Sequence, residues 1–158
     1  MAEPSLFTAD EVRFVRELRD DGVEFLVVGL SAAALQGAPA VTQDINLWFR
    51  DLSDPRFQAI VRRVGATYVP PSITNPPLLV GSGVALFDLV VHMHGLRSFD
   101  DEYAGAIEIE ILPGVSARVL PLERIVASKR AAGRDKDLAI LPVLEDALRT
   151  IRDREGSR

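Results

Sequence analysis

Residues 27–48, VVGLSAAALQGAPAVTQDINLW, decide the fold, because they hold parts of two expected strands and the short helix between them. The apolar run 23–28 has the length and the β-branched residues of a buried strand. An alanine-rich helix over 31–35 is expected to follow and to end at a glycine. Residues 44–49 then alternate between polar and apolar side chains, which predicts a second strand with two faces of opposite character.

The whole chain has the length and composition of one folded domain, and we expect residues 1–158 to form it. Its side chains are 26% charged and 47% hydrophobic, and the formal net charge of -5 argues against a general affinity for nucleic acid. The absence of cysteine excludes disulfides, thiol catalysis and thiolate zinc sites. No apolar run reaches the ~20 residues of a membrane-spanning helix, and the acidic N-terminus is unlike a secretory signal. A cytoplasmic protein without a membrane partner is therefore expected.

The remaining sequence predicts further helices and strands on both sides of this stretch. Thr8 and Glu11 have the spacing of a capping box at a helix start. The stretch 68–77 carries four prolines and is expected to be an ordered loop. The patterns predict helices over 9–19, 55–64, 122–132 and 135–151, a strand over 84–91, and a hairpin of strands over 107–112 and 115–120.

Three polar side chains on the expected strands suggest a metal site. Asp44 and Asn46 are two residues apart on one strand, so both leave the same face. Asp88 interrupts an apolar strand, where an unpaired buried carboxylate costs several kcal/mol, roughly, unless a cation compensates it. An oxygen-only donor set of this kind suits Mg²⁺ or Mn²⁺. The alternatives are that Asp44 caps a turn and that Asp88 forms a salt bridge with Arg97 or Arg118.

Other residues have a structural and a functional interpretation. Gly29 at a strand end and Ser31 in the next helix turn could offer N–H groups and a hydroxyl to a phosphate, or simply pack. His92 and His94 share the Asp88 face by strand parity, but histidines near a strand end are more commonly solvated than metal-bound. The basic cluster of the C-terminal helices is either a solvated face or a phosphate-binding surface; it comprises Lys129, Arg130, Arg134 and Lys136.

Together these residues resemble a known family. The run 27–48 resembles the signature of minimal nucleotidyltransferases of the DNA polymerase β superfamily, in which a glycine-rich turn and a helix ending in glycine precede Thr-x-Asp-x-Asp. The segment around Asp88 resembles the third carboxylate of that family, and residues 128–137 resemble its C-terminal Ser-Lys-x-x-x-x-Arg-x-Lys-Asp helix pair. The likeness spans about residues 20–145. The family includes abortive-infection toxin-like relatives, some of which act as toxin-antitoxin couples.

The resemblance implies an α+β fold with a mixed sheet, helices mainly on one face and a C-terminal helix pair. It also implies Mg²⁺-dependent transfer of a nucleoside monophosphate from a nucleoside triphosphate to an acceptor hydroxyl on RNA, protein or a small molecule. Carried onto this chain, the metal-binding and catalytic positions are Asp44, Asn46 and Asp88. The positions implied to bind nucleotide or phosphate are Gly29, Ser31 and Lys129.

Asn46 departs from the family pattern, because it stands at the position of the second carboxylate. Its amide oxygen can still ligate Mg²⁺, but the site loses one negative charge. Weaker metal binding and slower turnover are therefore expected. The alternative is a catalytically degenerate module that binds a nucleotide or a partner protein, as in a toxin-antitoxin couple.

Overall fold

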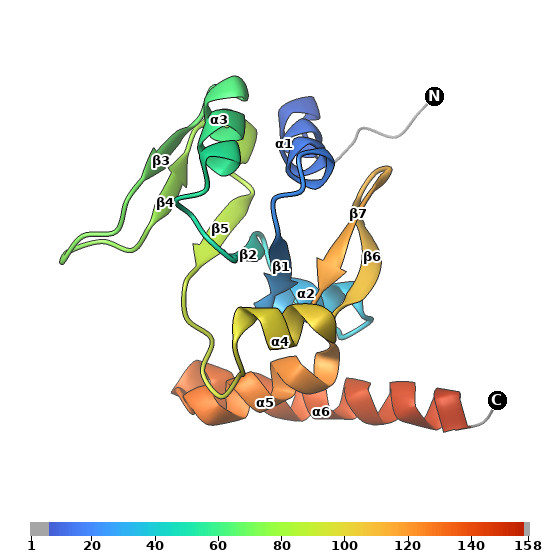
Figure 1. Ribbon diagram of the computed structural model, residues 1–158. Helices are drawn as coiled ribbons and strands as arrows, with labels where there is room; N and C mark the ends of the chain where they lie inside the picture. The colour runs from blue at the N-terminus through green and yellow to red at the C-terminus, as the bar shows by residue number, and fades with distance from the viewer. Residues whose placement is uncertain (1–6, 157–158) are drawn as a thin grey trace.

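The computed structural model describes residues 7–156 as a five-stranded sheet with helices on both sides (Figure 1). In chain order the elements are α1 (Ala9–Asp20), β1 (Phe25–Val28), α2 (Gly29–Leu35), β2 (Ile45–Phe49), α3 (Pro55–Arg63), β3 (Thr67–Val69), β4 (Leu78–Val80), the 3₁₀ turn η1 (Ser82–Val84), β5 (Phe87–Val90), α4 (Phe99–Ala104), β6 (Ile107–Leu112), β7 (Val115–Val119), α5 (Leu122–Ala132) and α6 (Asp135–Gly156). None of the helices in this part of the chain combines the length and apolarity that crossing a membrane requires.

The sheet has the strand order β5-β2-β1-β7-β6 and is mixed, as expected. Its central strand β1 runs antiparallel to β2 and parallel to β7. β2 and β5 are parallel, while β6 and β7 form the predicted hairpin. The α+β fold, the mixed sheet and the C-terminal pair α5 and α6 are therefore confirmed. The helices, expected mainly on one face, lie on both faces of the sheet (Figure 1).

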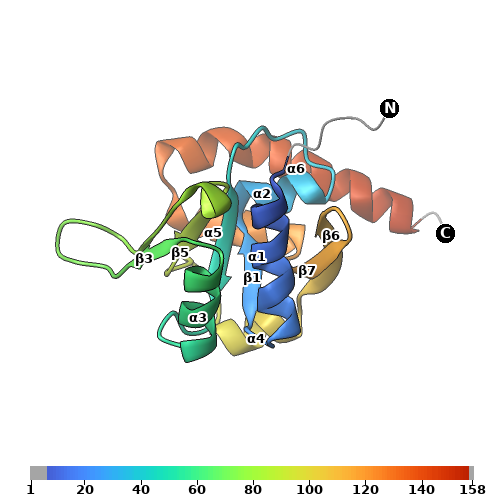
Figure 2. The same cartoon turned by 90° about the horizontal axis from the view of Figure 1, so that it is seen from above.

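One face of the sheet is apolar and packs on α1 and α3 (Figure 2). Phe49 of β2 lies 4.8 Å from Phe57 of α3, and Phe14 of α1 lies 5.2 Å from Phe87 of β5, measured between ring centroids. Strand parity places the intervening residues of β2 and β5 on the opposite face. The residues on that second face include the predicted metal ligands, so packing of the first face determines where the polar residues emerge.

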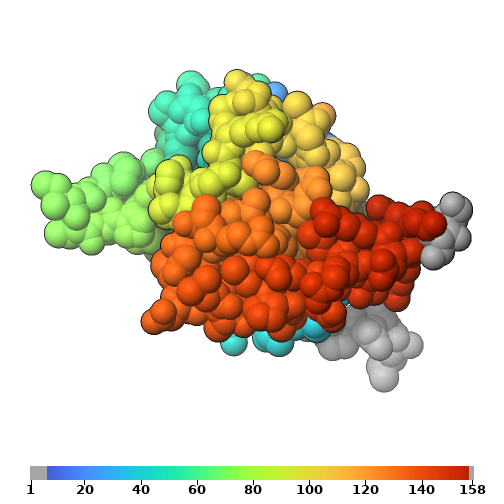
Figure 3. Space-filling view, turned by 90° about the horizontal axis from the view of Figure 1, so that it is seen from below, coloured from blue at the N-terminus to red at the C-terminus, as the bar shows by residue number. Residues whose placement is uncertain are grey.

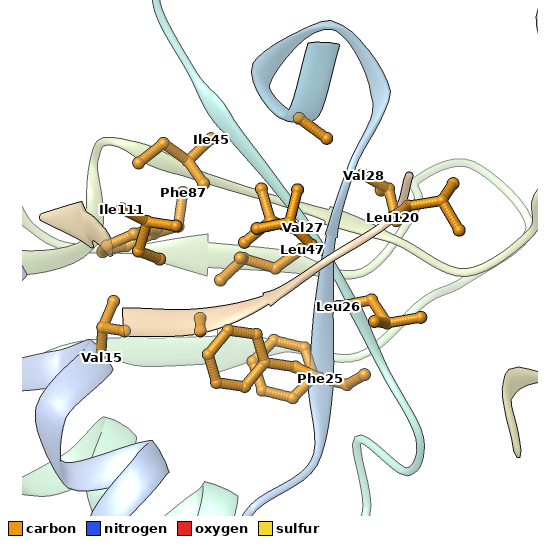
Figure 4. Close-up of a cluster of buried hydrophobic side chains, with 14 of the residues drawn as sticks. Val15, Phe25, Leu26, Val27, Val28, Ile45, Leu47, Phe87, Ile111 and Leu120 are labelled. Carbon is orange, nitrogen blue, oxygen red and sulfur yellow. The ribbon is translucent and has the colours of Figure 1, made fainter. Parts of the chain in front are cut away.

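The core around the sheet is built from buried hydrophobic side chains (Figure 4). Val27 of β1 and Leu47 of β2 are direct partners in the strand register, and both have an exposure of 0%. Val119 pairs with Val27 from the other side of β1 and is equally buried. This packing holds the strands rigidly in place, and with them the polar side chains on their other face.

The capping box at the start of α1 is confirmed and also holds a second element. The Thr8 amide donates to Glu11 Oε1 at 2.9 Å, and the Glu11 amide donates to Thr8 Oγ1 at 3.1 Å. The other Glu11 oxygen accepts from the Leu86 amide at 3.2 Å. The helix start is thereby tied to the residue that precedes β5.

Two local expectations need correction, and one helix was not expected. Residues 67–80 are a projecting hairpin arm, because β3 and β4 pair on the two sides of the proline-rich loop predicted over 68–77 (Figure 1). The strand predicted over 84–91 is shortened to β5, because η1 occupies its beginning. The helix α4 was not predicted, although Ser98 caps it by accepting from the Asp101 amide at 3.2 Å.

Candidate active site

A cleft of about 520 Å³ lies on the polar face of the sheet, at the ends of β1 and β2 and along β5. Its remaining wall is made by α5 and by the start of α6, which lie side by side across this side of the molecule (Figure 3). The predicted site residues that line it are Gly29, Asp44, Asn46, Asp88 and Lys129. Ser31, the other predicted site residue, is buried behind Asn46. The structure thus brings the predicted residues to one place.

Asp44, Asn46 and Asp88 form what we call the acidic floor of the cleft, and the strand register explains their position. Asn46 of β2 has Val28 of β1 as its partner on one side and Asp88 of β5 on the other. Asp44 lies just before β2, and its backbone is held by Thr42, whose hydroxyl donates to the Asp44 carbonyl at 2.9 Å. Asp44 therefore lies outside the strand on which it was expected, but its carboxylate lines the cleft together with Asn46 and Asp88.

The expectation that Asp88 is buried is wrong. The side chains of Phe87 and Leu89 face the core, while Asp88 between them is exposed to the cleft. The expected salt-bridge partner Arg118 instead lies 4.2 Å from the Tyr103 ring centroid and donates to the Tyr103 carbonyl at 2.9 Å. Within residues 7–156, Asp88 forms neither an ion pair nor a side-chain hydrogen bond.

The hydroxyl of Ser31 orients Asn46 from below. It accepts from the backbone N–H of Asn46 at 3.0 Å, donates to the Val28 carbonyl at 2.8 Å and lies 3.3 Å from the side-chain oxygen Asn46 Oδ1. Ser31 is only 3% exposed, so these contacts occupy the hydroxyl inside the protein. Phosphate binding by Ser31 stays a prediction, whereas its hydrogen bonds to the Asn46 residue are a feature of the fold.

Gly29 is required both by its backbone conformation and by its distance from Asn46. Its φ is +65°, and a Cβ at this position would lie 3.0 Å from Asn46 Oδ1. We expect Gly29→Ala to lower the free energy of unfolding by about 1–2 kcal/mol, since a side chain disfavours left-handed backbone. It should also weaken nucleotide binding about tenfold, equivalent to ~1.4 kcal/mol, by displacing the Asn46 amide.

Gly65→Ala is the matched control for this change. Gly65 has a φ of +73°, an added methyl group there would meet no atom within 4 Å, and the residue does not line the cleft. Thermal unfolding should show a similar loss for both variants, while calorimetric titration with a nucleotide should show a weaker Kd for Gly29→Ala alone. Equal Kd values for the two variants would contradict the role of the Gly29 contact.

The cationic wall of the cleft contains an ion-pair cluster that sequence reasoning did not identify. Lys129 Nζ lies 3.2 Å from Asp137 Oδ1, and Arg134 Nε donates to Asp137 Oδ2 at 2.6 Å. The Asp137 side chain is fully buried, and the Arg134 hydrogen bond is the main reason that the pKa of Asp137 falls to about 2. Lys129 and Arg134 both line the cleft. The motif at residues 134–137 was the available signal, but nothing in it indicated which cations Asp137 contacts.

His92 and His94 line the same cleft beyond Asp88. Their ring centroids are 4.6 Å apart, and both side chains are exposed. The following Gly95 packs so closely on α5 that a Cβ there would lie 2.4 Å from Ala131 Cβ. This contact holds the loop that follows β5 against the helix that carries Lys129. Among residues 7–156 there is no group of three His, Cys, Asp or Glu side chains that could hold a metal.

The residues of the acidic floor fit a hard divalent cation in donor chemistry but supply one charge fewer than three carboxylates. Asp44 and Asp88 are exposed to the cleft, and in the described part of the chain neither carboxylate pairs with a cationic side chain. The remaining donor is the Asn46 amide oxygen. Oxygen donors of this type are those that Mg²⁺ prefers. Asp44 also makes no side-chain hydrogen bond, within residues 7–156, that would support the turn-capping alternative.

The solved structures that resemble the chain include two that cover most of its length. One is a crystal structure of ANT(2″)-Ia in complex with adenylyl-2″-tobramycin, with a TM-score of 0.55, 14% identity, and coverage of 94% of this chain and 99% of that chain. The other is a solution structure of the antibiotic-resistance factor ANT(2″)-Ia, with a TM-score of 0.54, 14% identity, and coverage of 93% and 92%, respectively. These proteins are aminoglycoside nucleotidyltransferases, and the likeness shows that this chain has the nucleotidyltransferase fold. No protein-family model and no curated protein matches the sequence.

Proposed function

We propose that this protein transfers a nucleoside monophosphate from a nucleoside triphosphate to an acceptor hydroxyl. The observation that carries the proposal is the single cleft in which the Gly29 turn, the acidic floor and the Lys129 wall meet. The nucleotidyltransferase fold supports it independently. The acceptor is RNA, a protein or a small molecule, and kinship with abortive-infection toxins stays a prediction.

In this proposal Asp44, Asn46 and Asp88 hold Mg²⁺ or Mn²⁺. The bound cation supplies Lewis-acid polarisation and neutralises charge on the phosphates. Lys129 and Arg134 on the opposite wall add positive charge near the leaving pyrophosphate. The acceptor oxygen forms the new bond to the α-phosphorus, and the bond from that phosphorus to the bridging oxygen of pyrophosphate breaks. An Asp88 carboxylate oxygen, which lacks an ion-pair partner among residues 7–156, accepts the hydroxyl proton.

The presence of Asn46 favours a second candidate function, a module that binds a nucleotide or a partner protein without turnover. Its amide supplies no charge, so only Asp44 and Asp88 neutralise the cation from the protein side. If the protein binds a nucleotide but turns it over slowly, it is a transferase whose activity is reduced by the missing carboxylate.

Calorimetric titration with non-hydrolysable nucleoside triphosphates, in Mg²⁺ and in EDTA, tests the nucleotide binding that the transferase and a nucleotide-binding module share. We expect heat of binding that depends on Mg²⁺. Incubation with α-labelled triphosphates and cellular RNA, protein or metabolite fractions then separates the candidates, because only the enzyme leaves label on an acceptor. Absence of binding for all four nucleoside triphosphates would overturn the transferase and the nucleotide-binding module, and only a module that binds a partner protein would remain.

A further inference from the structure

The ion-pair cluster on the cleft wall is built around one buried carboxylate that contacts two cations. Asp137 Oδ1 contacts Lys129 Nζ at 3.2 Å and Arg134 Nη2 at 3.3 Å, while Oδ2 accepts from Arg134 Nε at 2.6 Å. Oδ2 is also 3.3 Å from the Arg134 amide. The exposed fractions are 0% for the Asp137 side chain, 19% for Lys129 and 55% for Arg134. The carboxylate is therefore inside the wall, and the two cations lie between it and the cleft.

The cluster joins the end of α5 to the start of α6 across Gly133. Comparison with a second ion pair between the same helices indicates that fastening them is not the main role of the cluster. Arg130 and Glu145 join the same two helices through a 2.8 Å ion pair. That pair lies outside the cleft lining and is more exposed, at 62% and 35%. A pair that only fastened the helices would not need a buried carboxylate, nor a position on the wall opposite Asp88.

Electrostatics and geometry make opposite predictions for the role of Asp137. With two cations and one carboxylate, the cluster carries a net charge of +1 by summation of the three formal charges. If charge alone governed anion binding, removal of the carboxylate would strengthen it. If the placement of the cations governs binding, removal of the carboxylate leaves two long side chains free to adopt other rotamers and weakens it.

We propose that Asp137 is a positioning residue of the nucleotide site, which holds Lys129 and Arg134 side by side so that both meet the phosphates of a nucleoside triphosphate. The inference rests on the proposed function. Lys129 then acts with its side chain already ordered, rather than as a mobile surface cation.

The test measures the Kd of a Mg²⁺-bound, non-hydrolysable nucleoside triphosphate together with the thermal midpoint. We expect Asp137→Asn and the smaller Asp137→Ser to weaken binding about tenfold. Asp137→Glu, which keeps a carboxylate, should recover part of the loss. Glu145→Gln is the matched control, because it breaks the other ion pair between α5 and α6 and should leave the Kd unchanged. With two neutral variants, the result does not depend on one of them folding.

The results separate this inference from the proposed function. If the parent protein binds no triphosphate, the proposed function fails and the positioning role fails with it. If the parent binds and the folded neutral variants bind equally or more tightly, only the positioning role is overturned. A lower thermal midpoint with an unchanged Kd assigns Asp137 to helix fastening, which also overturns the proposal.

Discussion

Replacing Asp88 by asparagine is expected to lower Mg²⁺-dependent nucleotidyl transfer about 100-fold or more. The change removes one of the two carboxylates on the acidic floor and the group that accepts the acceptor proton. Loss of a contribution of about 3 kcal/mol to the transition state corresponds to a fall of this size. Because Asp88 is exposed and unpaired within residues 7–156, the free energy of unfolding should change by less than about 0.5 kcal/mol.

Single-turnover transfer of label from an α-labelled triphosphate measures this effect without interference from product release. Asp101→Asn is a suitable control, since it removes an exposed carboxylate of α4 that does not line the cleft. Transfer by Asp101→Asn should equal that of the parent. If Asp88→Asn transferred label at the rate of the parent, Asp88 would have no part in the mechanism. Asp44 would then be the only carboxylate of the acidic floor with a role in transfer.

The second large effect is expected from Asn46→Asp, which restores a third carboxylate to the floor. Mg²⁺ affinity should rise at least about tenfold, because ligand charge is a main determinant of affinity for hard cations. Turnover should rise with it. In EDTA the same variant should unfold at a lower temperature than the parent, since like charges on neighbouring strands repel each other, and added Mg²⁺ should more than reverse the loss.

Thermal unfolding in EDTA and in a Mg²⁺ series gives both halves of this prediction from one measurement. Asn75→Asp makes the same change of charge in the loop between β3 and β4, outside the cleft, and should show no gain from Mg²⁺. If Asn46→Asp also shows none, the three positions do not hold a metal together. If it gains Mg²⁺ binding but no transfer activity, the module without turnover is the better description.

The positions of Asn46 and Asp88 on their strands were predictable from sequence, whereas Asp44, expected on the strand of Asn46, lies just before β2. The exposure of Asp88 was not predictable. Alternation in 44–49 correctly places Asn46 on the face opposite Leu47. The residues next to Asp88 are apolar, and this pattern is expected both for a strand buried on two faces and for a strand with one exposed face. The pattern therefore does not show whether Asp88 is buried. Only the three-dimensional packing of α1 and α3 on one side reveals that Asp88 faces a cleft.

Short elements and contacts between elements were the least predictable features. The strands β3 and β4 have three residues each, too few to show a period of two beside a proline-rich loop. The six residues of α4 are likewise too few for a helical apolar stripe. The contact of Lys129 with Asp137 depends on the sharp turn at Gly133, with a φ of +61°, which determines the direction in which α6 leaves α5.

The central place of β1 in the sheet also affects how the protein emerges from the ribosome. β2, on one side of β1, follows it closely in the chain, whereas β7, on the other side, spans Val115–Val119. Until that segment has been synthesised, a nascent chain carries Val27 on an unpaired strand edge, although all residues of the acidic floor have already been made. Such edges promote aggregation, and contacts between distant segments slow folding. Co-translational protection by chaperones should therefore matter most for chains that end shortly before β7.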